Sequence, residues 1–362
     1  MLHGGLISFL ARNAALSALL VLLVIGAAAA YLKLEFLGTT LSSDYDTYVL
    51  TAQYLKGEVV AIPGDISIPQ RLLKPAYPAY LAAMSSITDF HTAALAQALF
   101  FYLLFIVAMY LLAREFFEDT FPSVIVALLS AFSYPVLKYG VDVYSETGAW
   151  FAYALSLWLT FRFIRHPTAK IFLANSIVIT VGFLWKEYAI ITAIVFGLAI
   201  LFHAALQVRE KILYILAYAG IFLSVHIPWQ AYVLRVFDFS YLDWYLAGGA
   251  DGFSYEFTLK NIIKSTAALL GTMWLFVPLG FSRLRAAAWE KRLFAYLSTP
   301  VPFIGYAWGF ISSRLLYVIA PPMLLVAVLG MRDWSRRTQI AATAAALVAN
   351  IGWLILSYRI TL

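Results

Sequence analysis

The sequence predicts an all-α fold: a polytopic integral membrane bundle of about eleven transmembrane helices. Of the 362 residues, 63% are apolar and only 12% are charged, whereas about 25% of the residues of an ordinary soluble domain are charged. A soluble protein of this length could not bury so much apolar surface. Apolar stretches of about 20 residues, the length at which a helix spans the hydrocarbon core of a bilayer, also recur along the whole chain.

Charged residues and helix breakers divide the chain into apolar segments that we expect to span the membrane. These segments lie near residues 14–32, 92–112, 121–137, 147–164, 171–185, 187–205, 212–230, 266–283, 293–311, 315–331 and 338–357. No internal repeat of the kind found in many transporters is evident in the sequence. We therefore expect residues 1–362 to form a single membrane domain.

Basic residues set the expected orientation, because Lys and Arg accumulate on the cytoplasmic side of membrane proteins. In this chain they concentrate in the short connections on the side of the N-terminus, for example at Arg114, Arg165, Lys211 and Arg337. We therefore expect a multi-pass protein of the plasma membrane with a cytoplasmic N-terminus and two long connections outside. The formal net charge of +6 reflects this topology and gives no support for a nucleic-acid partner.

The two long connections, residues 33–91 and 231–265, are the most informative feature of this organisation, because loops of such length usually have a function. In the first, residues 48–55 and 76–84 carry apolar or aromatic residues at helical spacing, which predicts two amphipathic interfacial helices. These helices either contribute to a site or only seal the loop against lipid headgroups. The second connection combines aromatic and acidic residues, which suit either a sugar site or an interfacial aromatic belt.

Short polar segments stand at the expected outer ends of the spans. They are residues 43–48 (SDYDTY), 71–81 (RLLKPAYPAYL), 144–146 (YSE), 182–186 (GFLWK) and 313–322 (SRLLYVIAPP). In sequence and in order they resemble segments of the GT-C glycosyltransferases, in particular the lipid A aminoarabinose transferases and the related protein O-mannosyltransferases. Ala76 departs from the second proline of the family's Lys-Pro-Pro-Leu segment. Larger members carry a C-terminal outer domain that this sequence does not show, which leaves the acceptor open.

The resemblance implies a GT-C-like transferase that moves a sugar from a polyprenyl-phosphate carrier to a glycan, lipid or protein acceptor on the extracytoplasmic face. Such chemistry needs a carboxylate that orients or deprotonates the acceptor hydroxyl and cations that stabilise the departing phosphate. The implied catalytic carboxylates are Asp44 and Asp46, and the implied cations for the lipid phosphate are Lys74, Lys186 and Arg314. Weaker candidates for binding the sugar or the acceptor are Tyr48, Asp142 and Glu146.

Each catalytic or phosphate-binding candidate also has a purely structural interpretation. Asp44 or Asp46 could cap the helix that follows, since an acidic residue before an amphipathic stretch is a common helix start. Lys74 and Lys186 could extend to the membrane interface, as lysines at the ends of spans usually do. The sequence alone leaves both interpretations open.

The pairing of the other charged residues is equally open, as is the class of function. Glu146 and Asp142 could pair with Lys138 or line a sugar pocket, and Glu187 could neutralise the adjacent Lys186. A transporter or flippase of a lipid-linked or glycan precursor is the alternative function, and a structural subunit is a third. Transporters tend to carry ionisable residues near the membrane midplane, whereas most ionisable residues here lie at the ends of spans, which favours the enzyme.

No cofactor is required for this chemistry, because Lys and Arg can neutralise a departing monophosphate. A divalent cation stays an alternative, since Asp44 and Asp46 are spaced like the metal-binding Asp-x-Asp of nucleotide-sugar transferases. The five histidines lack the spacing of a metal site, so no metal ligand is assigned. The chain has no cysteine, which excludes disulfides, thiol nucleophiles and cysteine-bound metals.

Overall fold

The computed structural model describes residues 13–42, 44–244, 246, 258–308 and 312–359, and these residues fold almost entirely as helices. The α-helices are α2 (Ala14–Leu37), α3 (Tyr45–Leu55), α4 (Ser67–Leu72), α5 (Ala76–Met84), α6 (Phe90–Phe117), α7 (Thr120–Ala131), α8 (Glu146–Arg165), α9 (Ala169–Trp185), α10 (Ile190–Phe202), α11 (Val208–Phe237), α13 (Leu259–Leu270), α14 (Val277–Leu284), α15 (Trp289–Ser298), α16 (Ala320–Gly330) and α17 (Arg336–Arg359). Shorter helical turns join several of them, and in the described residues the extended structure amounts to one isolated bridge between Leu41 and Val143. The all-α fold predicted from the sequence is therefore confirmed.

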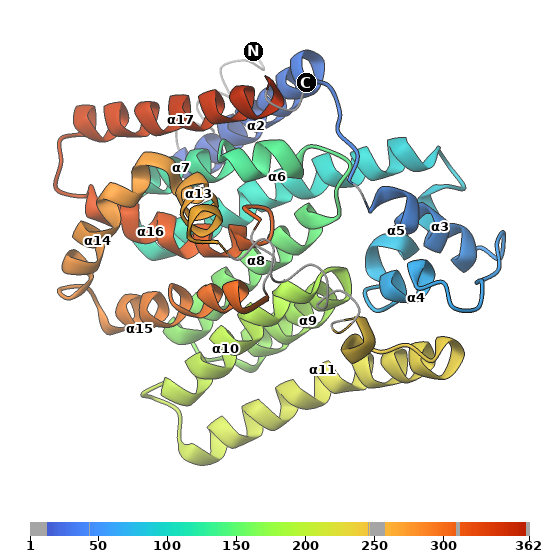
Figure 1. The fold of residues 1–362 in the computed structure, drawn as a ribbon. Helices are drawn as coiled ribbons and strands as arrows, with labels where there is room; N and C mark the ends of the chain where they lie inside the picture. Colours follow the sequence, from blue (N-terminus) through green and yellow to red (C-terminus); the bar gives the residue numbers. More distant parts are fainter. Residues whose placement is uncertain (1–12, 43, 245, 247–257, 309–311, 360–362) are drawn as a thin grey trace, which may run out of the picture.

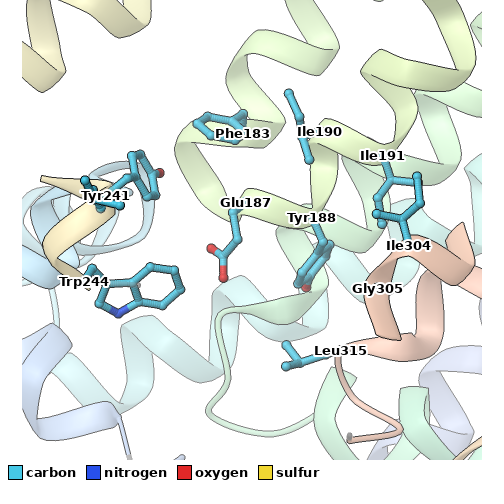
Figure 2. A pocket seen from close by; sticks show the side chains of 11 residues that line it. Phe183, Glu187, Tyr188, Ile190, Ile191, Tyr241, Trp244, Ile304, Gly305 and Leu315 are labelled. Carbon is cyan, nitrogen blue, oxygen red and sulfur yellow. The ribbon is translucent and has the colours of Figure 1, made fainter. Parts of the chain in front are cut away.

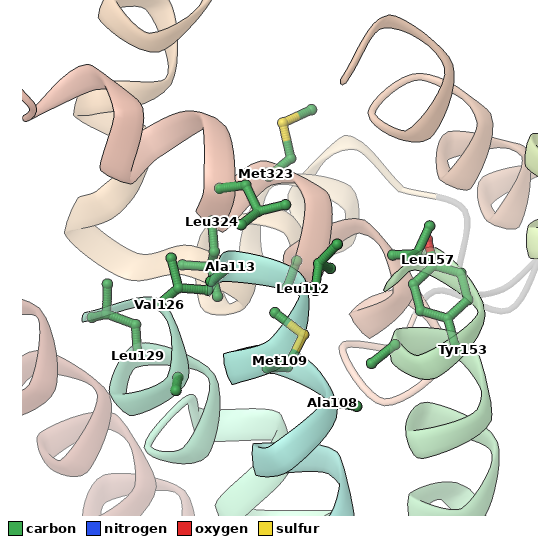
Figure 3. Packing of buried hydrophobic residues seen from close by; sticks show 14 of the residues in the cluster. Ala108, Met109, Leu112, Ala113, Val126, Leu129, Tyr153, Leu157, Met323 and Leu324 are labelled. Atoms are coloured by element: carbon green, nitrogen blue, oxygen red, sulfur yellow. The ribbon is translucent and has the colours of Figure 1, made fainter. Parts of the chain in front are cut away.

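The core of the bundle is built around α6, α8 and α16. Every residue of α16 is buried, and its Met323 and Leu324 pack in the same cluster as Met109 of α6 and Leu157 of α8 (Figure 3). Glycines let α14 approach α16 closely, because a side chain at Gly280 would meet the backbone of Val326. Around this core, α2 and α17 lie along one edge and α11 along the opposite edge (Figure 1).

Five helical segments are long and apolar enough to cross a bilayer in the part of the chain that the structure describes, counting α13, the 3₁₀ turn after it and α14 as one segment. They are Ala14–Leu37, Phe90–Phe117, Val208–Phe237, Leu259–Leu284 and Arg336–Tyr358. Several other predicted spans correspond to shorter apolar helices of 10 to 17 residues. An integral membrane protein is thus supported, while the number of eleven spans stays a prediction.

Two predicted spans are interrupted, which hydropathy does not detect. The span at 266–283 is broken at Gly271, whose φ of 55° ends α13 and leads into a 3₁₀ turn before α14. The span at 293–311 ends as an α-helix at Ser298, where prolines 300 and 302 follow and a 3₁₀ helix continues. Proline lacks the N–H that an α-helix requires, and glycine reaches positive φ without strain.

The first long connection folds into three short helices at one end of the bundle (Figure 1). The two predicted amphipathic helices are present as α3 and α5, and α4 between them was not predicted. Tyr48 and Ala52 of α3 pack against Tyr77 and Leu81 of α5 and against the start of α6. Because these apolar faces are covered by protein, α3 and α5 do more than seal the loop against lipid.

The expected orientation can be tested by labelling introduced cysteines, since the chain has none of its own. Val60 is 84% exposed in the first long connection, and Ala169 is exposed at the start of α9. In intact cells, Val60→Cys should react with a membrane-impermeant thiol reagent, while Ala169→Cys should react only after permeabilisation. Labelling of Ala169→Cys in intact cells would reverse the assigned topology.

Candidate active site

Seven charged side chains from five separate segments form a network of ion pairs where the first long connection meets the bundle. The ion pairs join Asp44 to Arg71, Lys74 to Glu187, and Glu146 to both Lys186 and Arg314. The charges of Lys186 and Arg314 also act on Asp44, which connects the first pair to the third. Removing charges from water is costly unless they are paired, so these pairings explain how the groups are held inside the protein.

Asp44 stands immediately before α3 but does not cap it with its side chain. Its carboxylate instead lies 2.9 Å from Nη2 of Arg71. Arg71 is fixed in turn, because its Nε donates to Oγ1 of Thr47 at 2.8 Å and its guanidinium lies 4.6 Å from the ring centre of Tyr48. The capping interpretation is therefore wrong for Asp44, whose carboxylate is held by an arginine instead.

Opposing effects act on the pKa of Asp44. Burial raises it, but the positive charges of Arg71, Lys186 and Arg314 together outweigh burial and hold this pKa below its ordinary value. Asp44 is therefore ionised at neutral pH and can accept a hydrogen bond or a proton. The same charges make it a weaker base than an isolated carboxylate.

Glu146 begins α8 and is almost fully buried, with an exposed fraction of 1%. Its Oε1 lies 2.9 Å from Nζ of Lys186 and 3.4 Å from Nε of Arg314, so one oxygen faces two cations. Lys186 reaches this position because α9 ends at Trp185, whose indole packs over Gly148 and donates to the carbonyl of Ser145 at 2.7 Å. The two predicted phosphate-binding residues Lys186 and Arg314 are thus brought together.

Lys74 lies beside the same cluster. Its Nζ is 2.7 Å from Oε2 of Glu187 and 4.3 Å from the ring centre of Trp244. Lys74 and Lys186 are only 3% and 5% exposed, so the interpretation that they extend to the membrane interface is wrong. Of the open alternatives for Glu187, direct pairing with Lys186 is not formed, since the carboxylate of Glu187 pairs with Lys74.

An apolar cavity of about 510 Å³ opens beside these charges (Figure 2). Its walls are mainly aliphatic and aromatic, and among the described residues that line it one, Glu187, carries a carboxylate. Two wall residues, Tyr188 and Leu315, adjoin charged members of the network in sequence, namely Glu187 and Arg314. The cavity therefore offers space for an apolar chain with cations at its side.

The remaining candidates are placed differently. Asp46 is exposed and forms no ion pair with any described residue. Asp142 lies in a separate buried cluster, where it pairs with Lys33 and accepts hydrogen bonds from Thr40 and from the hydroxyl of Tyr358 at 3.2 Å. These bonds occupy the Asp142 carboxylate and join residues of α2 and α17, so Asp142 holds the bundle together rather than facing the charged network.

Tyr48 and Lys138, which the sequence also singled out, both contact aromatic or hydroxyl groups and form no ion pair with the described residues. Tyr48 is buried against the guanidinium of Arg71, and its hydroxyl lies 3.2 Å from Oγ of Ser145. Tyr48 therefore holds Arg71 in position and is not itself open to a substrate. Lys138 pairs with neither Glu146 nor Asp142 but lies over tyrosine rings, so the alternative that paired it with one of these carboxylates is wrong. Within the described ranges, His, Asp and Glu do not gather in groups of three that could hold a metal ion.

Three further residues of the site, Arg71, Tyr241 and Trp244, could not be assigned a role from the sequence. Tyr241 and Trp244 belong to the second long connection and line the cavity, and the Tyr241 hydroxyl donates to the carbonyl of Leu73 at 3.1 Å. Arg71 stands three residues before Lys74 in a motif that the sequence already singled out, and this spacing was the available signal. Asp251 and Glu256, two of the four acidic residues of that connection, lie outside the described residues.

Residues 74–231 match the family model of the dolichyl-phosphate-mannose-protein mannosyltransferases. The resemblance seen in the sequence is confirmed over this segment, which holds Lys74, Glu146, Lys186 and Glu187. Asp44, Arg71 and Arg314 lie outside it. A search of curated proteins finds no match for the chain. The matched family indicates a membrane glycosyltransferase with a polyprenyl-phosphate-linked sugar donor.

Proposed function

We propose that this protein transfers a sugar from a polyprenyl-phosphate carrier to an acceptor at the extracytoplasmic face of the plasma membrane. The observation that carries the proposal is the cation-rich network beside an apolar cavity, at the end of the bundle formed by the first long connection. A lipid-linked donor combines an apolar chain with a phosphate. The apolar chain matches the apolar cavity, and the phosphate matches the cations beside it.

The charge balance of the network suits a phosphate. Among the described residues, the network pairs four cations with three carboxylates, which leaves an excess of one positive charge. The excess lies at Lys186 and Arg314, because they share one oxygen of Glu146. Arginine can bind phosphate with two parallel N–H donors, so we assign the donor phosphate to Arg314 and Lys186, with Lys74 beside them.

In the reaction we propose, the acceptor hydroxyl oxygen attacks the anomeric carbon of the donor sugar. A bond forms between that oxygen and the anomeric carbon, and the bond from the anomeric carbon to the phosphate oxygen breaks. The hydroxyl proton passes to Asp44, and the electron pair of the broken bond stays on the polyprenyl phosphate. The extra negative charge that the phosphate gains is stabilised by Lys74, Lys186 and Arg314, so no cofactor is needed for this step.

The direct test uses the purified full-length protein with polyprenyl-phosphate mannose labelled in the sugar. We expect free polyprenyl phosphate to accumulate together with labelled product, because transfer cleaves the sugar–phosphate bond. Excess EDTA should leave the rate unchanged within about twofold, since the cations that stabilise the leaving group are side chains. Movement of intact donor across a vesicle membrane without cleavage would contradict the proposal and support a flippase.

A further inference from the structure

A second, polar cavity of about 260 Å³ lies on the other side of the Arg314 turn from the apolar cavity. The sequence neighbours of Arg314 line both spaces, since Ser312 and Ser313 face the polar cavity and Leu315 faces the apolar one. Aromatic contacts continue this connection. The guanidinium of Arg314 lies 5.5 Å from the ring centre of Tyr144, and the ring of Tyr144 meets that of Tyr139 in the polar wall edge to face, with 5.3 Å between the ring centres. The phosphate-binding arginine thus stands between two cavities of opposite character.

The wall of the polar cavity presents hydrogen-bonding groups and a positive charge. It contains Lys264 together with hydroxyls from three serines, the amide of Asn261, and the rings of two tyrosines and Trp353. None of the described residues that line it is acidic. A concave surface with hydroxyl donors, an ammonium group and no carboxylate attracts an anion.

A second lysine, Lys138, adds to the positive potential of the polar cavity. Lys138 lies over the rings of Tyr134 and Tyr139, at 5.6 Å from each ring centre, and both tyrosines line the cavity. Neither Lys138 nor Lys264 forms an ion pair with any residue that the structure describes. The closest carboxylate in sequence to Lys138, that of Asp142, is already bound to Lys33. Both positive charges therefore stay available to a ligand.

We propose that this polar cavity binds the acceptor and that the acceptor carries a phosphate group held by Lys264. The acceptor role rests on the proposed transferase function, because it places the acceptor across the Arg314 turn from the lipid chain of the donor. A phosphate attached to a membrane lipid and a phosphate on a soluble sugar share the chemistry that the cavity recognises. The anion preference itself does not depend on sugar transfer.

The anion preference can be measured in a variant with a single cysteine in the cavity wall, since the native chain has none. Ser265→Cys places a thiol of similar size beside Lys264. The labelling rate is measured with two methanethiosulfonate reagents, one bearing a sulfonate and one bearing a trimethylammonium group. Each rate is divided by the rate of the same reagent with a free thiol in solution. The ratio of the two normalised rates reports the electrostatic potential at the cysteine. We expect the anionic reagent to be favoured about threefold to tenfold.

Two lysine variants in the Ser265→Cys background identify the source of that preference. Lys264→Gln should remove most of it, whereas Lys260→Gln should preserve it, because Lys260 is an exposed lysine of the same helix that does not line the cavity. Equal normalised rates for the two reagents would overturn the proposal. An unchanged preference in Lys264→Gln would overturn it as well.

Protection experiments then separate the two sources of phosphate. Slower labelling with glucose 6-phosphate, but not with glucose, would support a soluble phosphate ester. Slower labelling in nanodiscs of phosphatidylcholine with phosphatidylglycerol than in phosphatidylcholine alone would support a lipid phosphate. If neither protects, the phosphate site is refuted even where sugar transfer is observed. If protection occurs while donor cleavage is never seen, the anion site stands and the transferase function fails.

Discussion

Replacing Asp44 by Asn is expected to reduce sugar transfer by roughly 10²-fold or more, the range for loss of a positioned base. The amide keeps the size of the side chain and still presents an oxygen to Arg71, whose Nη2 lies 2.9 Å from the native carboxylate. It cannot accept the acceptor proton. The measurement is single-turnover transfer from a labelled polyprenyl-phosphate donor, with thermal stability of the variant in detergent recorded alongside.

The neighbouring carboxylate supplies the matched control. Asp46 is two residues away but exposed, so Asp46→Asn should change transfer by less than about threefold. Both variants should stay close to native stability, since the amide oxygen in Asp44→Asn can still accept a hydrogen bond from Arg71 and Asp46 forms no ion pair with any described residue. Full activity in Asp44→Asn would remove it from the mechanism, and a larger loss in Asp46→Asn would transfer the role to Asp46.

The pH dependence of the rate provides a further check on Asp44. The positive charge of Arg71 contributes to holding the pKa of Asp44 below its ordinary value. Arg71→Leu removes that charge, so the pKa should rise and the acidic limb of the pH–rate profile should move to higher pH. Arg71→Lys keeps the charge and should leave that limb close to its native position. A profile that does not move in Arg71→Leu would mean that another group sets the acidic limb.

The fold could be predicted where helices are continuous. The segments predicted at 147–164 and 338–357 lie within two residues of α8 and α17 at both ends, because apolar runs bounded by charges mark helix ends directly. Hydropathy located the apolar segment at 266–283 but could not detect the helix breaks there or in 293–311, because it measures transfer from water and contains no information on backbone geometry. The positive φ of Gly271 is a property of the folded chain.

The site could be predicted in residue type but not in pairing. The resemblance pointed to Asp44, Lys186 and Arg314, and the structure brings these residues together. Their partners could not be read from the sequence, since Glu146 meets Arg314 only after the last third of the chain has packed against α8. Asp142 was also a candidate, but it lies outside the site. It is only four residues before Glu146 in the sequence, yet its carboxylate pairs with Lys33 of α2. Contacts between distant segments decide which charges form the site.

Replacing Arg314 by Ala is expected to weaken donor binding by roughly tenfold to a hundredfold, the range for losing a hydrogen-bonded charge. Arg314→Lys should weaken it less, because the charge is kept while the planar guanidinium is lost. Neither change leaves Glu146 unpaired, since Lys186 lies 2.9 Å from the same carboxylate oxygen. The loss should therefore appear in affinity rather than in stability. It can be measured by titrating each variant with a fluorescent polyprenyl-phosphate analogue.

A second arginine gives the control for this substitution. Arg336 also lies over an aromatic ring, that of Phe121 at 5.3 Å, but it belongs to the start of α17 on the expected cytoplasmic side. Arg336→Ala should bind the analogue as tightly as the native protein does. A dephosphorylated analogue distinguishes binding of the lipid chain from binding of the phosphate. The native protein and Arg314→Ala should bind this free polyprenol equally, because Arg314 acts on the phosphate. Native affinity of Arg314→Ala for the phosphorylated analogue would show that Arg314 only holds Glu146 in place.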